Sequence, residues 1–182
     1  MNAQPAPAPT TAWPIGDDPA LSAEVRRELV DSLVARGGVG REQAEAELAA
    51  RDVAADFERR FAPLGLDRRE LPDVLAAQII GMWSIVHDAA FPSADIARAL
   101  SRQLASSLPG RAEAVDPRKR QLVGEALIHE TVLALEARDA ARAAGRRSEL
   151  KQMAESAQRN MLNRQAINLR KTQLTPQGMR RG

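Results

Sequence analysis

The sequence predicts an all-α protein: a single bundle of about six helices around a central apolar helix, behind a disordered leader rich in proline and alanine. Apolar residues make up 44% of the 182 positions, which is enough for one domain of ordinary size with its own core. Good helix formers dominate the composition, and the chain has no Tyr. Turn and capping signals divide the chain into six segments with helical spacing of apolar residues.

Residues 1–19 are expected to form the leader. Five prolines alternate there with Ala and Thr, and repeated proline removes backbone donors and blocks helix formation. Trp13 is the exception in this segment. An incidental exposed ring is the favoured interpretation of Trp13, and docking of a short segment onto the body is the alternative.

The first two helices are expected over residues 19–36 and 41–61. Asp18 is a good capping residue, and Pro19 suits the first helical position. The glycine pair at 37–38 ends this helix. The second helix is expected to run unbroken until the sequence Pro-Leu-Gly at 63–65.

The third helix, over 67–87, is the predicted centre of the bundle. Asp67 and Glu70 form a capping-box pattern, and apolar residues then cover nearly the whole circumference of the helix. Trp83 is expected in the core, so its replacement by Ala should destabilise the protein as a buried Trp would. Gly81 is expected to let a neighbouring helix approach closely, although a merely tolerated glycine is an equal alternative.

Three more helices are expected over 92–108, 117–144 and 148–164. Gly145 separates the last two, and so short a connection predicts an antiparallel helical hairpin. Residues 20–164 therefore make up the predicted bundle. Residues 165–182 are expected to be a basic, partly ordered C-terminal segment.

Motifs for catalysis or for cofactors are scarce. The chain has no Cys and two His, and it has no phosphate-binding or dinucleotide-binding glycine loop. His87 is interpreted as structural. Glu125 and His129 share a helix face, but zinc and di-iron spacings are missing, so a solvated ion pair is the favoured interpretation. We expect no enzyme activity, cofactor or metal, unless Glu125, His129 and another carboxylate prove to surround a cavity.

The distribution of charge is the most informative feature. From residue 141 onward the chain has ten Lys or Arg and two acids, a net charge of +8, whereas the first 140 residues have a net charge of −6. Such polarity can favour an anionic partner without identifying it. Seven residues are candidates for partner binding: Arg142, Arg146, Arg147, Lys151, Arg164, Arg170 and Lys171.

Three interpretations of this basic region stay open. It can dock on the acidic helices of the same chain, bind an unidentified protein partner or anionic surface, or bind nucleic acid through phosphate contacts. The chain has only five aromatic residues, which disfavours binding that depends on base stacking. Its longest apolar stretch, 74–86, is too short for a transmembrane helix.

Five stretches carry a resemblance to a known family: FAPLGL at 61–66, DVLAA at 73–77 with Trp83 after it, RALSRQL at 98–104, QLVGEAL at 121–127 and LTPQG at 174–178. In this order and spacing, residues 24–178 resemble a bacterial family of helical proteins classed only as a domain of unknown function. Members are typically exported with a cleavable signal peptide, which this sequence lacks, and they typically have an aromatic residue where Met179 stands.

The resemblance implies a helical fold and an address in the cell envelope, and it assigns no catalytic residue. The expected function is therefore that of a non-enzymatic bacterial binding protein, periplasmic or secreted if a signal peptide was removed and otherwise cytoplasmic. The alternative is a cytoplasmic nucleic-acid-binding protein that uses the basic C-terminal region.

Overall fold

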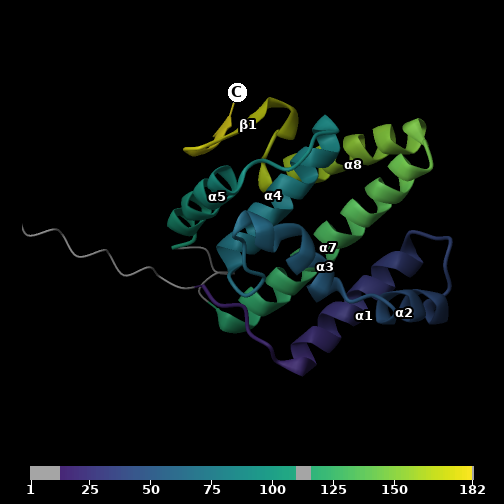
Figure 1. Ribbon diagram of the computed structural model, residues 1–182. Coiled ribbons are helices and arrows are strands. Elements are labelled where there is room, and N and C mark those ends of the chain that lie inside the picture. Colours follow the sequence, from purple (N-terminus) through teal and green to yellow (C-terminus); the bar gives the residue numbers. More distant parts are fainter. Residues whose placement is uncertain (1–12, 110–115, 182) are drawn as a thin grey trace, which may run out of the picture.

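The computed structural model describes residues 13–109 and 116–181. Within these ranges it confirms an all-α bundle, to which a two-stranded hairpin is added at the C-terminal end (Figure 1). The helices are α1 (Pro19–Ala35), α2 (Arg41–Ala49), α3 (Val53–Phe61), α4 (Leu71–His87), α5 (Ala94–Ser107), α7 (Pro117–Ala143) and α8 (Arg147–Gln165). Short 3-10 turns are η1 (Ala62–Leu64) and η2 (Leu169–Lys171), and the strands are β1 (Thr172–Thr175) and β2 (Gly178–Arg181).

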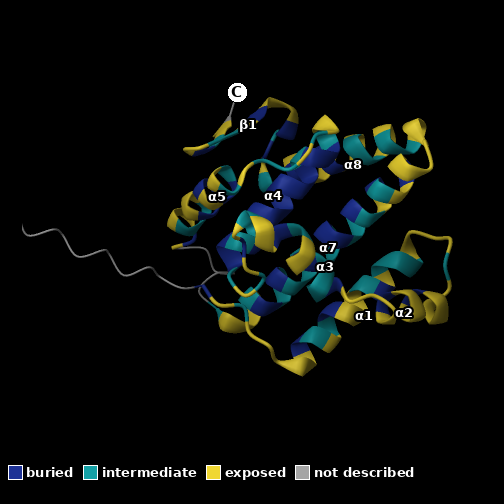
Figure 2. Ribbon diagram, viewed as in Figure 1, coloured by how far each residue is buried: buried dark blue, intermediate teal, exposed yellow. Residues whose placement is uncertain are grey.

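Helix α4 is the centre of the bundle, as predicted. Twelve of its 17 residues are buried, and α5, α7 and α8 pack around it (Figure 2). The helix begins at Leu71 and not at Asp67, because Asp67 accepts a hydrogen bond from the backbone N–H of Arg69 and so caps a separate turn. At its other end Asp88 adopts a left-handed conformation that stops the helix.

Gly81 allows α7 to approach α4 closely, which was one of the two alternatives for this glycine. A Cβ at this position would lie 3.0 Å from Cγ2 of Thr131 and 3.5 Å from Cδ1 of Leu135. Thr131 and Leu135 are themselves fully buried. A methyl group at Gly81 would therefore be tighter than an ordinary van der Waals contact, and Thr131 would have to shift to admit it.

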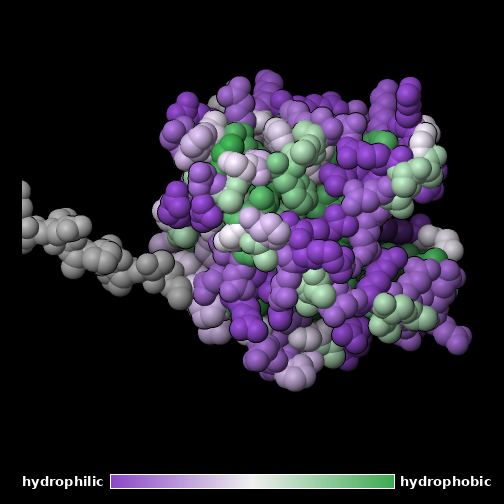
Figure 3. All heavy atoms as spheres, viewed as in Figure 1, coloured by the Kyte–Doolittle hydropathy of each residue, from purple (hydrophilic) through white to green (hydrophobic). Residues whose placement is uncertain are grey.

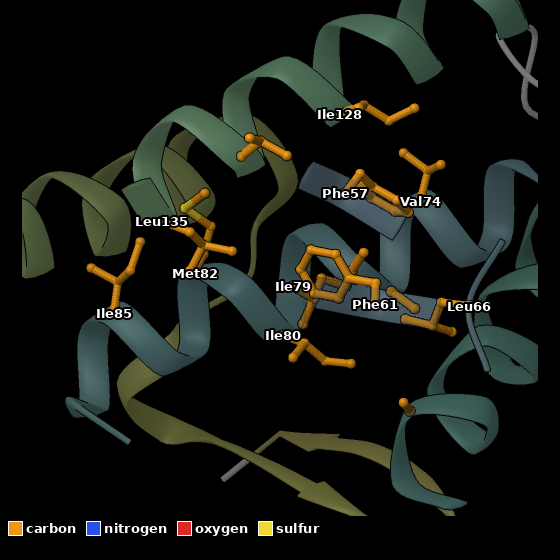
Figure 4. Close-up of a cluster of buried hydrophobic side chains, with 14 of the residues drawn as sticks. Phe57, Phe61, Leu66, Val74, Ile79, Ile80, Met82, Ile85, Ile128 and Leu135 are labelled. Carbon is orange, nitrogen blue, oxygen red and sulfur yellow. The ribbon is translucent and has the colours of Figure 1, made fainter. Parts of the chain in front are cut away.

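The main core lies between α3, α4 and α7 (Figure 4). Phe57 and Phe61 are fully buried, with ring centroids 4.8 Å apart, and Phe91 stacks on Phe61 at 5.2 Å. Their spacing of four residues places both rings on one face of α3. These rings contribute contact area at the centre of the bundle, where all three Phe residues of the chain lie.

The predicted helix over 41–61 is wrong in one respect, because the structure divides it into α2 and α3. The carboxylate of Asp52 accepts a hydrogen bond from the N–H of Ala55 at 3.0 Å and starts a new helix there. The two halves also bury their apolar faces in different places. Leu48 packs with Val30 of α1, whereas Phe57 enters the main core. One straight helix cannot reach both clusters.

The leader was predicted to extend to residue 19, with an exposed Trp13 as the favoured interpretation, and this is wrong for residues 13–19. The alternative, a short segment docked on the body, is the one that the structure shows. Trp13 is only 8% exposed and packs with Leu71 and Leu108. Its backbone N–H donates to the carboxylate of Glu70 at 3.0 Å, and its carbonyl accepts from Leu71 N at 3.0 Å. Burial of the indole and the hydrogen bonds of this segment together offset the entropy cost of ordering it. The rest of the predicted leader, residues 1–12, lies outside the described residues.

The C-terminal segment adds structure that an all-α prediction omits. Ala166 ends α8 in a left-handed conformation, and β1 then pairs with β2 in antiparallel register from Thr172 opposite Arg181 to Thr175 opposite Gly178. The hairpin packs on α5, where the side chain of Gln103 bonds both N and O of Met179.

Trp83 joins this hairpin to the central helix. Its Nε1 donates to the carbonyl of Thr172 at 3.1 Å, and its ring lies 4.6 Å from that of His87. His87 Nε2 in turn donates to the carbonyl of Leu169 at 3.0 Å, which agrees with a structural role. Trp83 is half-buried, so the prediction that it lies in the core is only partly right.

No helix among the described residues has the length and apolar character needed to cross a bilayer.

Candidate functional site

A polar cavity of about 620 Å³ lies where the N-terminal segment, α1, the α2–α3 corner and α7 meet. Fifteen residues line it: Ile15, Gly16, Asp17, Ser22, Arg26, Leu48, Arg51, Asp52, Val53, Ala54, Arg68, Arg69, Glu125, Ile128 and His129. Ligand sites in proteins commonly have a volume of this size. Eight of the lining side chains are ionisable, so the cavity is a polar site and not a gap in the core.

One buried amide holds the N-terminal wall of this cavity in place. The side chain of Gln121 is 2% exposed. Its Oε1 accepts from the N–H of Asp18 at 3.1 Å, and its Nε2 donates to the carbonyl of Asp18 at 2.8 Å. A Cβ on Gly16 would lie 2.8 Å from the same Oε1, so the wall passes Gln121 too closely for a larger residue. The backbone at 16–18 is therefore a fixed part of the site.

Glu125 is held by two donors at the floor of the cavity. Its Oε1 accepts from Ser22 Oγ at 2.8 Å and from Gln121 Nε2 at 2.8 Å. The sequence predicted a solvated ion pair of Glu125 with His129, and this prediction is wrong. No ion pair joins the two side chains within 4.0 Å among the described residues, because the carboxylate is turned toward Ser22 and Gln121.

His129 has the most perturbed environment in the cavity. Burial lowers the pKa of its imidazole, and the charge of Arg26 lowers it further, while Glu125 acts in the opposite direction. The ring is therefore neutral at pH 7. Nδ1 is buried without a hydrogen-bond partner, and the residue lines the cavity.

The cations of the cavity fall into two groups. Arg51 pairs with Glu136 at 3.6 Å, and Arg68 pairs with Glu58 at 2.6 Å. Arg26 and Arg69 are exposed and have no acidic partner within 4.0 Å in the part of the chain that the structure describes. Two guanidinium groups thus remain available at the cavity.

Enzyme activity was to be reconsidered if Glu125, His129 and another carboxylate surrounded a cavity, and the structure meets this condition. Glu125, His129, Asp17 and Asp52 all line one cavity. Asp52, however, is occupied as the cap of α3, and Glu125 is held by two donors. Over residues 13–109 and 116–181, no group of three or more His, Asp or Glu side chains is placed to hold a metal ion. The ionisable lining side chains without an ion-pair or hydrogen-bond partner among the described residues are Arg26, Arg69, Asp17 and His129.

The seven predicted partner-binding residues are all exposed, but they do not form one patch. Arg142, Arg146, Arg147 and Lys151 surround the α7–α8 turn. Arg164 lies near the other end of α8, a helix of 19 residues and therefore about 28 Å long. Arg170 lies beside the middle of this helix, because its N–H donates to Gln158 at 3.0 Å and its guanidinium pairs with Glu155. The candidate residues are therefore spread along α8.

Four of these seven residues form ion pairs within the chain. Arg142 pairs with Asp88, Arg146 with Glu149, Arg164 with Glu130 and Arg170 with Glu155. Docking on acidic residues of the same chain thus accounts for part of the basic region. The remaining three, Arg147, Lys151 and Lys171, have no acid within 4.0 Å among the described residues, and the same holds for Arg159, which was not among the candidates.

A second cavity, of about 420 Å³, lies between α1, α4, α7 and α8. Its walls are largely apolar and include Met82, Met153 and Met161, with Arg36 and Arg164 at its edge. The hollow at the right of Figure 3 lies between α1 and the α7–α8 hairpin, while hydrophilic side chains cover most of the face shown. Sequence analysis missed both cavities, because each one needs residues from at least four separated segments.

Comparisons of the chain with protein-family models, with curated proteins and with solved structures found no match.

Proposed function

We propose that this chain is a non-enzymatic binding protein that engages an acidic protein partner through a basic surface along α8, defined by Arg147, Lys151 and Arg159. Binding of a partner at this surface requires no reactive group. It offers long, flexible cations, which favour partners of opposite charge and speed their encounter.

The observation that carries the proposal is the pairing of the two acids in this region. Glu149 is held by Arg146 at 3.0 Å and Glu155 by Arg170 at 2.5 Å. Arg147, Lys151 and Arg159 are exposed, and the part of the chain that the structure describes places no acid within 4.0 Å of them. Leu162 on the same helix is 46% exposed, so an apolar contact is available beside the cations. Interfaces commonly combine such an apolar contact with a polar, charged rim.

A cell-envelope address is part of the same proposal. It is supported by the resemblance of residues 24–178 to a family whose members are typically exported. The compartment is tested separately, by fractionating bacteria that express the complete reading frame and detecting the protein in the periplasmic fraction.

The binding surface is tested with two triple variants of equal charge. The first is Arg147→Glu, Lys151→Glu and Arg159→Glu on α8. The control is Arg27→Glu, Arg102→Glu and Lys119→Glu, three exposed cations on α1, α5 and α7. Capture from a nuclease-treated bacterial extract should yield an acidic protein with the wild type and the control, but not with the α8 variant.

Equal capture by both triple variants would show that the α8 surface is not the binding site. Duplex DNA is the second probe. Binding of DNA that weakens steeply with salt and disappears in the α8 variant would assign the surface to nucleic acid instead.

A further inference from the structure

A second binding activity follows from the polar cavity beside α7, which lies apart from the α8 surface. We propose that this cavity binds a small molecule with an oxyanion group, a carboxylate or a phosphate, through Arg26, Arg69 and His129.

Some of the charged side chains that line the cavity already have a partner, and others have none among the described residues. Two of the three carboxylates are occupied, since Asp52 caps α3 and Glu125 accepts bonds from Ser22 and Gln121. Two of the four arginines pair with acids outside the cavity lining. The free charged groups are the guanidiniums of Arg26 and Arg69 and the carboxylate of Asp17. Counted together, the four arginines and three carboxylates that line the cavity have a formal net charge of +1.

The two arginines without an ion-pair partner come from separate elements of the fold. Arg26 comes from α1, and Arg69 comes from the turn before α4. Side chains from two separate elements that line the same cavity can both contact an anion bound there. A guanidinium group also presents paired N–H donors that match a carboxylate or phosphate.

The imidazole of His129 is neutral and lies near Arg26. Its neutral ring lies close enough to Arg26 for that cation to lower its pKa, so the two side chains belong to one site. Nδ1 is buried without a hydrogen-bond partner, and a neutral imidazole has one N–H that can donate to an oxyanion. Charged and neutral donors together are typical of sites that bind an oxyanion.

Contacts within the protein preorganise the N-terminal wall of the cavity. Gln121 clamps the backbone at 16–18, and Trp13 anchors the segment that precedes it. A preformed wall lowers the entropy cost of binding. Asp17, exposed at the rim on this wall, favours ligands that carry a hydroxyl or ammonium donor in addition to the oxyanion.

The two histidines make the test direct. His129 lines the cavity, whereas His87 bonds to Leu169 at the far end of α4. Sodium phosphate and sodium acetate are titrated separately into the full-length protein, with sodium chloride of equal ionic strength as the blank. The ring resonances of both histidines are followed by NMR. We expect at least one of the two anions to shift the His129 resonances along a saturating curve and to leave those of His87 in place.

The anion that saturates at the lower concentration identifies the preferred group. Arg26→Gln and Arg69→Gln should each weaken its binding by about tenfold, the scale of one charged hydrogen bond. Arg27→Gln is the matched control, because Arg27 is the exposed neighbour of Arg26 on α1 and does not line the cavity.

Three results would overturn the proposal: no saturating shift of His129 with either anion, equal shifts of His87 and His129, or equal effects of Arg26→Gln and Arg27→Gln. Because Arg26 and Arg69 are exposed, their variants should melt at the wild-type temperature, which separates lost binding from lost folding. The triple variant on α8 (Arg147→Glu, Lys151→Glu and Arg159→Glu) should bind the anion with wild-type affinity, because these residues do not line the cavity.

Discussion

The side chain of Ile15 lies directly against the backbone of Gly124 on α7. A Cβ at Gly124 would overlap Cδ1 of Ile15 and lie 2.9 Å from its Cγ1. Ile15 also continues the short bridge that joins Pro14 to Glu70, since its N–H donates to the carbonyl of Arg69 at 2.7 Å. The glycine therefore makes room for the segment that forms one wall of the polar cavity.

Replacing Gly124 by Ala should displace this segment. We expect the free energy of unfolding to fall by about 1–3 kcal/mol, the usual cost of forcing an extra methyl group into a packed contact. Urea unfolding measures the change. The double variant Ile15→Ala, Gly124→Ala restores the space, so adding Gly124→Ala to Ile15→Ala should cost little. Additive losses in this cycle would show that the two residues do not meet.

Trp13 should prove to be an anchor and not part of a dispensable leader. Trp13→Ala should lower the free energy of unfolding by about 3–5 kcal/mol, because it removes a large buried ring from beside Leu71 and Leu108. Urea unfolding in a Trp83→Phe background measures this loss, and removal of residues 1–17 should cause a similar one. Wild-type stability after either change would contradict the packing of Trp13.

Trp83 should act mainly on the C-terminal hairpin. Trp83→Phe keeps most of the ring contact and removes the bond to the carbonyl of Thr172, so we expect a loss of about 1 kcal/mol. Amide hydrogen exchange should speed up in β1 and β2 more than in α4. Uniformly faster exchange along α4 would instead indicate that Trp83 belongs to the core. His87→Gln, which alters the neighbouring contact to Leu169, provides a comparison on the same helix face.

Asp139 should make stability depend on pH. Burial alone would raise the pKa of its carboxyl, but hydrogen bonds and charges from Arg60 and Arg138 outweigh burial and hold the pKa below the ordinary value of 3.8. The carboxylate therefore stabilises the folded state at pH values above about 3.8. This contribution is lost as the pH falls through the folded pKa.

Asp139→Asn should accordingly lower the free energy of unfolding by about 1–2 kcal/mol at pH 7, a figure reduced for solvent screening since the side chain is 41% exposed. Part of the loss arises because Arg138, buried against Ser84, keeps its charge without this partner. Urea unfolding at pH 7 and pH 3 measures it, and the difference from wild type should shrink at pH 3. Asp95→Asn, at an 82% exposed carboxylate, is the control and should have little effect at either pH.

Local patterns account for the elements that sequence analysis placed correctly. Helix α4 is apolar around nearly its whole circumference, so it is stable only in the middle of a bundle. Gly145 stands between two helices, and so short a connection predicts a helical hairpin. Errors arose where a distant contact decided the outcome. The break at Asp52 depends on two separate apolar clusters, and the hairpin after Ala166 depends on support from α5 and Trp83.

The candidate sites show the same division. Excess positive charge beyond residue 141 is visible in the sequence, but the pairing of Arg142 with Asp88 or of Arg164 with Glu130 is not, because those acids lie far away along the chain. The sequence singled out Glu125 and His129 from their helical spacing. It could not show that the docked segment 13–18 and the α2–α3 corner close a cavity around them.

Composition and periodicity by themselves determined that this chain is helical, that α4 is its core and that its positive charge gathers at one end. These properties depend on neighbours within a few positions and on the exclusion of apolar groups from water. The tertiary structure alone decided that Trp13 is buried, that Gln121 clamps the N-terminal segment and which arginines stay unpaired. Each of these outcomes depends on contacts between residues remote in sequence, whose free energy exists only once the chain has folded.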